Sequence, residues 1–302
     1  MSSPYQLLAI DLDGTLLDSR GNVSDANRDA IERAKSAGIR VCVCTGRGYN
    51  ECKHIAARIG QTDPVVVAGG AILADAKSGR SLHRFNMRPP LVGKLVESFV
   101  GHGHAALVLK DACPVNDSGL HPKHDYLVVS PDGERAIDPV TRWWFKEHDI
   151  RIHVVPALAH DDHPNHTVRV GICGTRRATL GAARDLSEKF APEVTVHHFN
   201  AVVPGAHGDH ADDHIVILEA FDRTVSKWNA IRWLAEREGI DTGHIAAIGN
   251  DINDIAMLEG ASCSIAMGNA IPEAKRAARL HTLDNDSDGV AHAIDRILAG
   301  AW

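Results

Sequence analysis

Short apolar segments alternate with helical patterns at the two ends of this chain. Near the amino end, the apolar runs 7–10 and 39–44 enclose a helical pattern that Ser24 can cap and Gly38 can end. The same alternation returns from Ser226 onward, where the pattern predicts helices over residues 227–238 and 289–298 and strands over residues 245–248 and 264–267. Strands joined by helices pair in parallel through right-handed crossovers, and the helices cover the resulting sheet. We therefore predict an α/β fold whose parallel sheet is built from both ends of the chain.

A different pattern occupies the middle of the chain. After Arg88-Pro89-Pro90, helical patterns are mixed with strand pairs of the kind that form hairpins. The chain has 302 residues, which is enough for two hydrophobic cores. We predict a core domain formed by residues 1–84 and 222–302, and an inserted α+β domain formed by residues 85–221.

The charge and composition exclude several kinds of partner. The formal net charge is −7 and no tract of Lys or Arg occurs, so we expect neither a nucleic acid nor an anionic membrane surface as a partner. No apolar run reaches the ~18 residues of a membrane span, and the first residues do not resemble a secretory leader. The six cysteines lack the spacing of a zinc site and resemble reduced core residues. These features predict a cytoplasmic protein.

Two acidic residues follow the first predicted strand. Asp11 and Asp13 are separated by one residue, so in an extended segment their side chains point to the same side. One carboxylate can attack an electrophile and form a covalent intermediate while the other moves a proton. Two close carboxylates also favour a divalent cation such as Mg²⁺. The pair therefore indicates an anionic substrate such as a phosphate ester, although a solvated Asp-Gly turn would show the same sequence.

Three more loops carry polar residues at the ends of predicted elements. Thr45 follows the second strand, where its hydroxyl and nearby N–H groups can hold a phosphoryl oxygen. Lys227 begins a helix, where a cation opposes the helix dipole and so suggests a bound anion. The loop 249–254 places amide and acidic groups after another strand. Each feature alone also fits an ordinary cap or a solvated lysine, but together they favour a site at the carboxyl ends of the strands.

These four segments together resemble the motifs of the haloacid dehalogenase superfamily of phosphohydrolases, in its Cof-type branch with a large α/β cap. The resemblance covers nearly the whole chain and follows the order of the motifs. The matching segments are residues 11–18, 44–47, 225–227 and 249–258. The resemblance implies a Rossmann-like core, and it places the cap between Thr45 and Lys227.

The resemblance also implies a role for each site residue. Asp11 would be the nucleophile that forms an aspartyl-phosphate, and Asp13 would be the general acid and then the base. Mg²⁺ would be bound by the Asp11 carboxylate, the Asp13 backbone carbonyl and Asn250. The residues that hold the substrate phosphate would be Thr45, Gly46, Lys227 and Asn253.

Two positions depart from the pattern of this branch. Asn250 stands where an aspartate is usual, so it offers Mg²⁺ only a neutral amide oxygen. Asp254 is expected as a further ligand, and Asp251 as a substitute, either directly or through water. Gly69 stands where asparagine is often found, which removes a polar side chain near the substrate.

Histidines are abundant and gather in two segments, residues 160–163 and 207–214. Both segments contain residue types that bind metals, but no spacing that defines a site. We expect solvated loops without a specific metal, or a histidine at the substrate entrance that becomes charged near about pH 6.5.

These observations predict a Mg²⁺-dependent phosphatase that hydrolyses a small phosphorylated metabolite, and sugar phosphates are the first substrate class to expect. Related alternatives are a dedicated phosphatase for trehalose, sucrose or mannosyl-phosphoglycerate esters, and a phosphomutase that returns the phosphoryl group to its substrate. The alternative of another class is a regulatory module that binds a phosphorylated metabolite, because Asn250 would weaken metal binding. The sequence indicates neither the ester nor the oligomeric state, so a monomer and a homodimer both fit.

Overall fold

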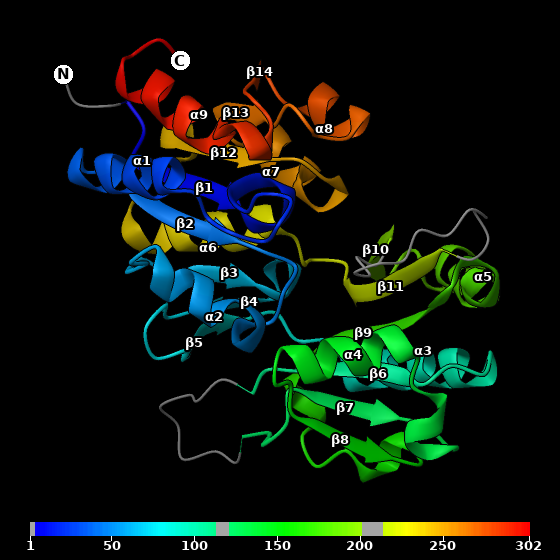
Figure 1. Cartoon of the computed structure of the whole chain (residues 1–302). Helices are drawn as coiled ribbons and strands as arrows, with labels where there is room; N and C mark the ends of the chain where they lie inside the picture. Colours follow the sequence, from blue (N-terminus) through cyan, green and yellow to red (C-terminus); the bar gives the residue numbers. More distant parts are fainter. Residues whose placement is uncertain (1–3, 113–120, 201–213) are drawn as a thin grey trace. The chain divides into compact units, whose positions relative to one another are not determined.

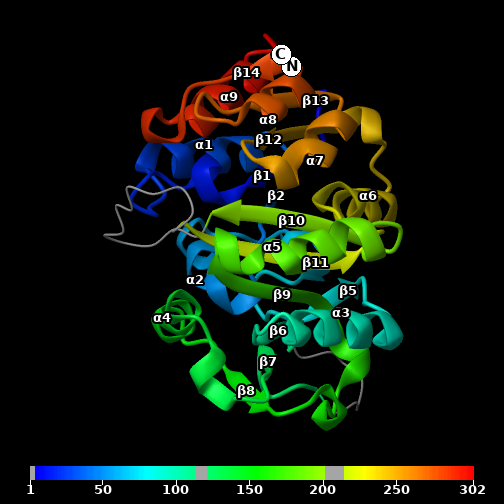
Figure 2. The same ribbon diagram turned by 90° about the vertical axis from the view of Figure 1, so that its right-hand side faces the viewer.

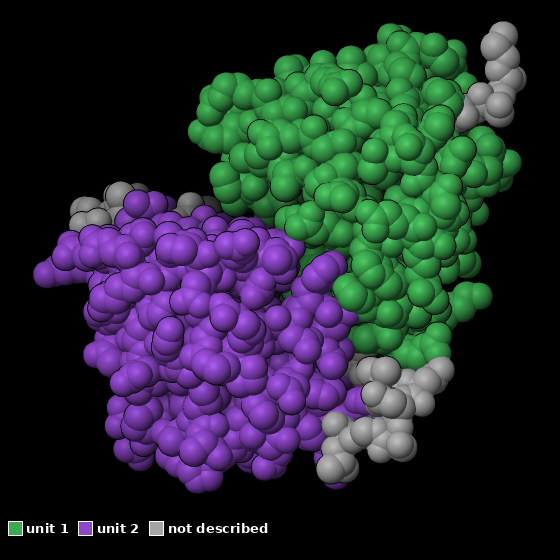
Figure 3. Space-filling view, turned by 180° about the vertical axis from the view of Figure 1, so that it is seen from behind, with its two compact units in different colours: residues 1–83, 226–302 green, residues 84–225 purple. Residues whose placement is uncertain are grey.

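The chain forms two compact units, which Figure 3 colours separately. Unit 1 contains residues 1–83 and 226–302, and unit 2 contains residues 84–225. The computed structural model describes residues 4–112, 121–200 and 214–302, so residues 207–213 of the second histidine-rich segment lie outside the described residues. Within the described ranges, no helix combines the length and the apolar composition needed to cross a membrane.

Unit 1 is built around an eight-stranded sheet in the order β14-β13-β12-β1-β2-β3-β4-β5 (Figure 1). Its strands are β1 (Leu7–Asp11), β2 (Arg40–Cys44), β3 (Val65–Val67), β4 (Ile72–Ala74), β5 (Ser81–Arg84), β12 (Ile245–Gly249), β13 (Cys263–Ala266) and β14 (Leu280–His281). β1 is buried along its whole length and pairs in parallel with β2 on one side and β12 on the other. The centre of the sheet therefore combines segments from both ends of the chain, as the sequence predicts.

Helices cover both faces of this sheet (Figure 1). They are α1 (Asp25–Ser36), α2 (Tyr49–Arg58), α6 (Lys227–Glu238), α7 (Ile255–Gly260), α8 (Pro272–Ala277) and α9 (Gly289–Leu298). Ser24 caps α1 as predicted, because its hydroxyl oxygen accepts a hydrogen bond from the Asn27 N–H at 3.1 Å. α1 packs on α9, and the Asn27 side chain accepts a hydrogen bond from the Ala291 N–H at 2.9 Å. These contacts join the first and last helices of the chain.

Unit 2 has a six-stranded sheet of its own, in the order β10-β11-β9-β6-β7-β8. Its strands are β6 (Ala106–Lys110), β7 (Tyr126–Val129), β8 (Ile152–Val155), β9 (Thr167–Thr175), β10 (Val194–Asn200) and β11 (Ile215–Asp222). Neighbouring strands run antiparallel except β7 and β8, which are parallel. Its helices are α3 (Pro89–Gly101), α4 (Pro139–Glu147) and α5 (Arg176–Asp185).

Two helices cover one face of this second sheet, and Figure 2 looks onto that face. Leu95 and Phe99 of α3 and Ala182 of α5 are buried against apolar side chains of the strands, such as Val108 and Val170. Every member of this cluster lies within residues 87–220. Unit 2 therefore has a hydrophobic core built from its own residues.

The predicted helices 227–238 and 289–298 match α6 and α9 to the residue. The elements that the sequence analysis does not predict are β4, β5, β8, α8 and β14. These are short: β4 has three residues, and β14 has two. Segments of this length carry too few residues for a periodic pattern, so their pairing depends on the strands beside them.

Candidate active site

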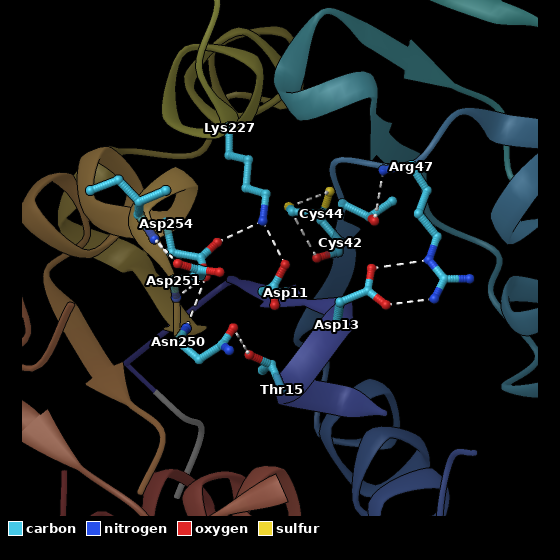
Figure 4. A network of polar contacts seen from close by, with 12 residues as sticks. Asp11, Asp13, Thr15, Cys42, Cys44, Arg47, Lys227, Asn250, Asp251 and Asp254 are labelled. Atoms are coloured by element: carbon cyan, nitrogen blue, oxygen red, sulfur yellow. Dashed lines mark hydrogen bonds and ion pairs between the residues drawn. The ribbon is translucent and has the colours of Figure 1, made fainter. Parts of the chain in front are cut away.

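The carboxyl ends of three neighbouring strands of unit 1 meet at one edge of the sheet. Asp11 is the last residue of β1 and lies beside Cys44, the last residue of β2, in the parallel register. On the other side of β1, β12 ends at Gly249, and Asn250 follows it. The loops after β1 and β12 therefore bring Asp13, Asn250 and Asp254 to one place beside Asp11, as Figure 4 shows.

Lys227 lies between two carboxylates of this group. Its ammonium group donates to Asp11 Oδ1 at 2.5 Å and to Asp254 Oδ1 at 2.6 Å, and its side chain is fully buried. Burial alone would lower the pKa of Lys227, but the charges and hydrogen bonds of Asp11 and Asp254 outweigh burial and raise it. Burial raises the pKa of Asp11 to about 7, and repulsion from Asp254 adds to this effect while Lys227 opposes it. When both carboxylates are ionised, their negative charge exceeds the single positive charge of Lys227.

Asp254 organises the loop after β12. Its Oδ1 accepts from Lys227, and its Oδ2 accepts from the N–H groups of Asn250 at 2.8 Å and Asp251 at 3.0 Å. A Cβ atom on Gly249 would lie 2.7 Å from the Cβ of Asp254, so this close packing requires a glycine. Both oxygens of Asp254 are engaged by protein groups, which suits a positioning residue. Its role as a metal ligand stays a prediction.

The side chain of Asn250 faces three oxygen atoms. Its inward amide atom lies 3.0 Å from Asp11 Oδ2, from the Asp13 carbonyl oxygen and from Thr15 Oγ1. Mg²⁺ prefers octahedral oxygen ligands at about 2.1 Å, which places neighbouring ligands about 3.0 Å apart. With its amide oxygen inward, Asn250 therefore has the spacing of a magnesium ligand beside Asp11 and the Asp13 carbonyl. The donor set and the excess negative charge both fit this metal.

The oxygen atoms around Asn250 differ from the usual cluster of charged metal-binding side chains. Among the residues that the structure describes, no three His, Cys, Asp or Glu side chains are arranged to hold a metal ion. The set around Asn250 instead combines one carboxylate, one amide and one backbone carbonyl. In the histidine-rich segment 160–163 of unit 2, Asp161 accepts a hydrogen bond from the buried ammonium group of Lys110 at 2.5 Å. That carboxylate is therefore part of an ion pair within unit 2.

Arg47 is a site residue that the sequence analysis does not single out. Its guanidinium group donates from Nε to Asp13 Oδ2 at 3.0 Å and from Nη2 to Asp13 Oδ1 at 2.5 Å (Figure 4). This bidentate pair occupies both oxygens of the predicted general acid. In the same loop, the hydroxyl oxygen of Thr45 accepts from the Arg47 N–H at 3.1 Å. The signal in the sequence is a cation two residues after Thr45, in a loop that is expected to lie beside Asp11 and Asp13.

Three of the predicted phosphate-binding residues come from the loops after β2 and β12. Thr45 is fully buried. A Cβ atom on Gly46 would lie 3.6 Å from Asn253 Nδ2, so the two loops are in contact at this point. Asp251, the predicted substitute ligand, uses Oδ1 to accept from the Ile252 N–H at 2.6 Å and so shapes the same turn. The structure brings these residues together, and their roles toward phosphate and metal stay predictions.

A glycine turn after β3 packs against the start of α6. Gly70 has a φ of 106°, and a Cβ atom there would lie 2.2 Å from the Ser226 carbonyl oxygen. Only glycine fits so close to the Ser226 carbonyl oxygen. This contact packs the turn against the first residues of α6, where Lys227 lies. Gly69 has a φ of 66°, a conformation that asparagine also adopts. The backbone at residue 69 is therefore compatible with the asparagine that the Cof-type pattern often has there.

Comparison with known proteins identifies the family. The family model described as haloacid dehalogenase-like hydrolase matches residues 8–294. The chain belongs to the haloacid dehalogenase-like hydrolases. One relative, the 5-amino-6-(5-phospho-D-ribitylamino)uracil phosphatase YwtE of Bacillus subtilis, is 29% identical over 98% of this chain and 99% of that protein. Another, the phosphatase YwpJ of Bacillus subtilis, is 28% identical over 97% of this chain and 100% of that protein.

Two solved structures share the fold, and the first of them is a haloacid dehalogenase-like hydrolase. One from Bacteroides thetaiotaomicron covers 97% of this chain and 99% of its own, with a TM-score of 0.75 at 23% identity. The Thermotoga maritima protein TM0651 covers 97% of both chains, with a TM-score of 0.73 at 22% identity. The predicted family and the α/β fold with a Rossmann-like core are thus confirmed. The prediction of a hydrolase is confirmed as well, and its relatives are named phosphatases.

Proposed function

We propose that this haloacid dehalogenase-like hydrolase is a Mg²⁺-dependent phosphatase that cleaves a small phosphorylated metabolite through an aspartyl-phosphate on Asp11. The observation that carries the proposal is the buried Asp11 carboxylate, whose Oδ1 accepts from Lys227 and whose Oδ2 faces Asn250. Lys227 orients the nucleophile, and the oxygens around Asn250 fit the metal. Phosphoryl transfer depends on this combination of positioning and charge stabilisation.

The reaction has two steps. In the first, an oxygen of Asp11 attacks phosphorus, the bond from phosphorus to the ester oxygen breaks, and Asp13 donates a proton to that oxygen. In the second, Asp13 takes a proton from a water molecule whose oxygen attacks phosphorus, and Asp11 is released together with inorganic phosphate. When bound, Mg²⁺ offsets negative charge on the transferring group. The chain's own groups that hold the phosphoryl oxygens are Lys227, Thr45, Gly46 and Asn253.

Arg47 has to release one oxygen of Asp13 before the first proton transfer, while its other hydrogen bond can keep the carboxyl group in place. The bidentate pair uses both oxygens of Asp13, so at least one of its two hydrogen bonds must break when that carboxyl group turns to the ester oxygen. The Asp13 side chain is 52% exposed, which leaves it room to turn. Arg47 therefore acts as a positioning residue that holds Asp13 at the rim of the site until the substrate arrives.

Unit 2 is the part of the chain that we assign to substrate selection. The name of the relative YwtE describes a substrate that carries its phosphate on a ribityl group. Phosphorylated sugars and sugar alcohols are therefore the first substrate class to consider. The proposed enzyme acts on small esters in the cytoplasm, as a monomer or a homodimer, without a nucleic acid or a membrane as partner.

Phosphate release from a panel of phosphorylated sugars, sugar alcohols, nucleotides and cofactors tests this proposal. We expect turnover with Mg²⁺, its loss in EDTA, and a fall in kcat of roughly 10³-fold or more in Asp11→Asn. Asp25→Asn changes an exposed carboxylate on α1 and should keep the wild-type rate. Undiminished turnover in Asp11→Asn would refute the mechanism. An ester that isomerises without phosphate release would identify a phosphomutase, and tight binding without turnover would identify a regulatory module.

A further inference from the structure

We propose that the Asn250 amide replaces the metal in the metal-free enzyme: its Nδ2 donates to the oxygens of the metal site, and rotation of the amide then presents Oδ1 as a ligand. The inference rests on the Mg²⁺ site of the proposed function and adds a second role for one of its ligands. An aspartate at this position would have the ligand role alone.

The contacts of Asn250 suit a donor and a ligand equally well. With Nδ2 inward, the two hydrogens of the amide face three acceptors, Asp11 Oδ2, the Asp13 carbonyl oxygen and Thr15 Oγ1, each 3.0 Å from Nδ2. With Oδ1 inward, as Figure 4 draws it, the amide accepts from the Thr15 hydroxyl at 3.0 Å and faces the other two oxygens without a proton between them. The first orientation satisfies the site without a cation, whereas the second leaves oxygens facing oxygens until a cation joins them.

The surroundings confine this change to the side chain of Asn250. Its backbone N–H donates to Asp254 Oδ2 at 2.8 Å, and its carbonyl oxygen accepts from the Ile271 N–H at 2.9 Å. A Cβ atom on Gly14 would lie 2.5 Å from Asn250 Nδ2, so the glycine leaves the room that the outward amide atom needs. The last torsion of an asparagine side chain has a broad energy profile, which permits both orientations.

The charge of the site explains why a donor matters there. Asp11 and Asp254 share the single ammonium group of Lys227. A buried carboxylate oxygen without a donor is costly, and the inward Nδ2 supplies a donor to Asp11 Oδ2. Asn250→Asp would instead place a third carboxylate 3.0 Å from that oxygen. The natural asparagine therefore stabilises the metal-free site and weakens metal binding, because binding must first break these hydrogen bonds.

Thermal unfolding and calorimetric Mg²⁺ titration of the wild type and Asn250→Asp test the inference. In EDTA, we expect Asn250→Asp to melt several degrees below the wild type. Saturating Mg²⁺ should raise its Tm by several times the rise of the wild type, and its Mg²⁺ affinity should be at least about tenfold higher. Asn22→Asp adds the same charge at an exposed position and is the matched control, with wild-type behaviour in both conditions.

Asn250→Ala removes both the donor and the ligand. We expect it to melt below the wild type in EDTA and to gain little from Mg²⁺, which separates loss of the donor from gain of a carboxylate. If Asn250→Asp folds only in Mg²⁺ and unfolds on chelation, that result agrees with the inference in its extreme form.

The side-chain amide of Asn250 gives a readout that is independent of stability. Its ¹⁵N–¹H signals, assigned by their absence in Asn250→Ala, should exchange slowly with solvent in EDTA and faster once Mg²⁺ is bound. Equal Tm shifts in the wild type and Asn250→Asp, or an amide signal that Mg²⁺ leaves unchanged, would overturn the amide switch alone. A titration in which neither protein binds Mg²⁺ would overturn the metal site of the proposed function as well.

Discussion

Arg47 holds Asp13 through two hydrogen bonds, although the two residues lie 34 positions apart in the chain. We expect Arg47→Ala to lower kcat by roughly 10- to 100-fold, because the proton donor then loses its defined position. Arg47→Lys keeps the charge but lacks the planar fork, so it should recover only part of the loss. Steady-state kinetics with the best ester of the panel measures both effects.

Circular dichroism should be unchanged in both Arg47 variants, since Arg47 lies in a loop outside the hydrophobic core. Arg28→Ala removes an exposed arginine of α1 that pairs with Asp25 and Asp29, and it should keep the wild-type kcat. A wild-type kcat in Arg47→Ala would show that the position of Asp13 does not depend on the guanidinium group.

At the level of elements, one carboxylate joins the two helices that cover the sheet of unit 2. Asp185 of α5 accepts from Lys189 at 2.9 Å and from the Ser98 hydroxyl of α3 at 2.7 Å, and His102 lies 3.2 Å from it. The hydrogen bonds from Lys189 and Ser98 lower the pKa of Asp185 to about 2. We expect Asp185→Asn to lower the free energy of unfolding by roughly 0.5–1 kcal/mol at pH 7, since the ion pair of Asp185 and Lys189 lies near the surface.

The lowered pKa determines how this loss depends on pH. The carboxyl group binds a proton more readily in the unfolded chain, near its ordinary pKa of 3.8, than in the folded protein. Its contribution is therefore complete above about pH 4 and disappears as the pH falls toward 2. Denaturant unfolding should show that the difference in the free energy of unfolding between the wild type and Asp185→Asn becomes smaller below about pH 4. A difference that stays constant with pH would contradict this role of the Asp185 carboxylate. As a control, Asp132→Asn changes an exposed carboxylate and should have the wild-type free energy of unfolding at pH 7.

At the level of the whole molecule, the two units differ in how the chain builds them. The core of unit 2 lies within residues 87–220, whereas unit 1 needs both ends of the chain. We expect residues 84–225 expressed alone to fold and to unfold cooperatively. Residues 1–83 alone should stay unfolded, because β1 then lacks β12 and α1 lacks α9. Far-UV circular dichroism with denaturant titration checks both fragments, and a folded fragment 1–83 would refute this view of unit 1.

The sequence by itself determined the features that depend on near neighbours. Helical periodicity located α6 and α9 to the residue. The spacing of Asp11 and Asp13, and the positions of Thr45 and Asn250 after apolar runs, indicated a site at the strand ends. These signals are local, because side-chain direction alternates along a strand and repeats along a helix within a few residues. They also carried the resemblance from which the family and the hydrolase class were predicted.

The tertiary structure alone decided which of these groups touch. Lys227 binds Asp11 across 216 positions of the sequence, and Thr15 contacts Asn250 across 235. Such contacts depend on the order and register of β1, β2 and β12, which no local pattern specifies. The same holds for the fork of Arg47 on Asp13 and for the oxygens around the Asn250 amide. Sequence therefore named most of the site's residues, while the assembled sheet determined their partners, because the geometry between distant residues exists only once the strands have paired.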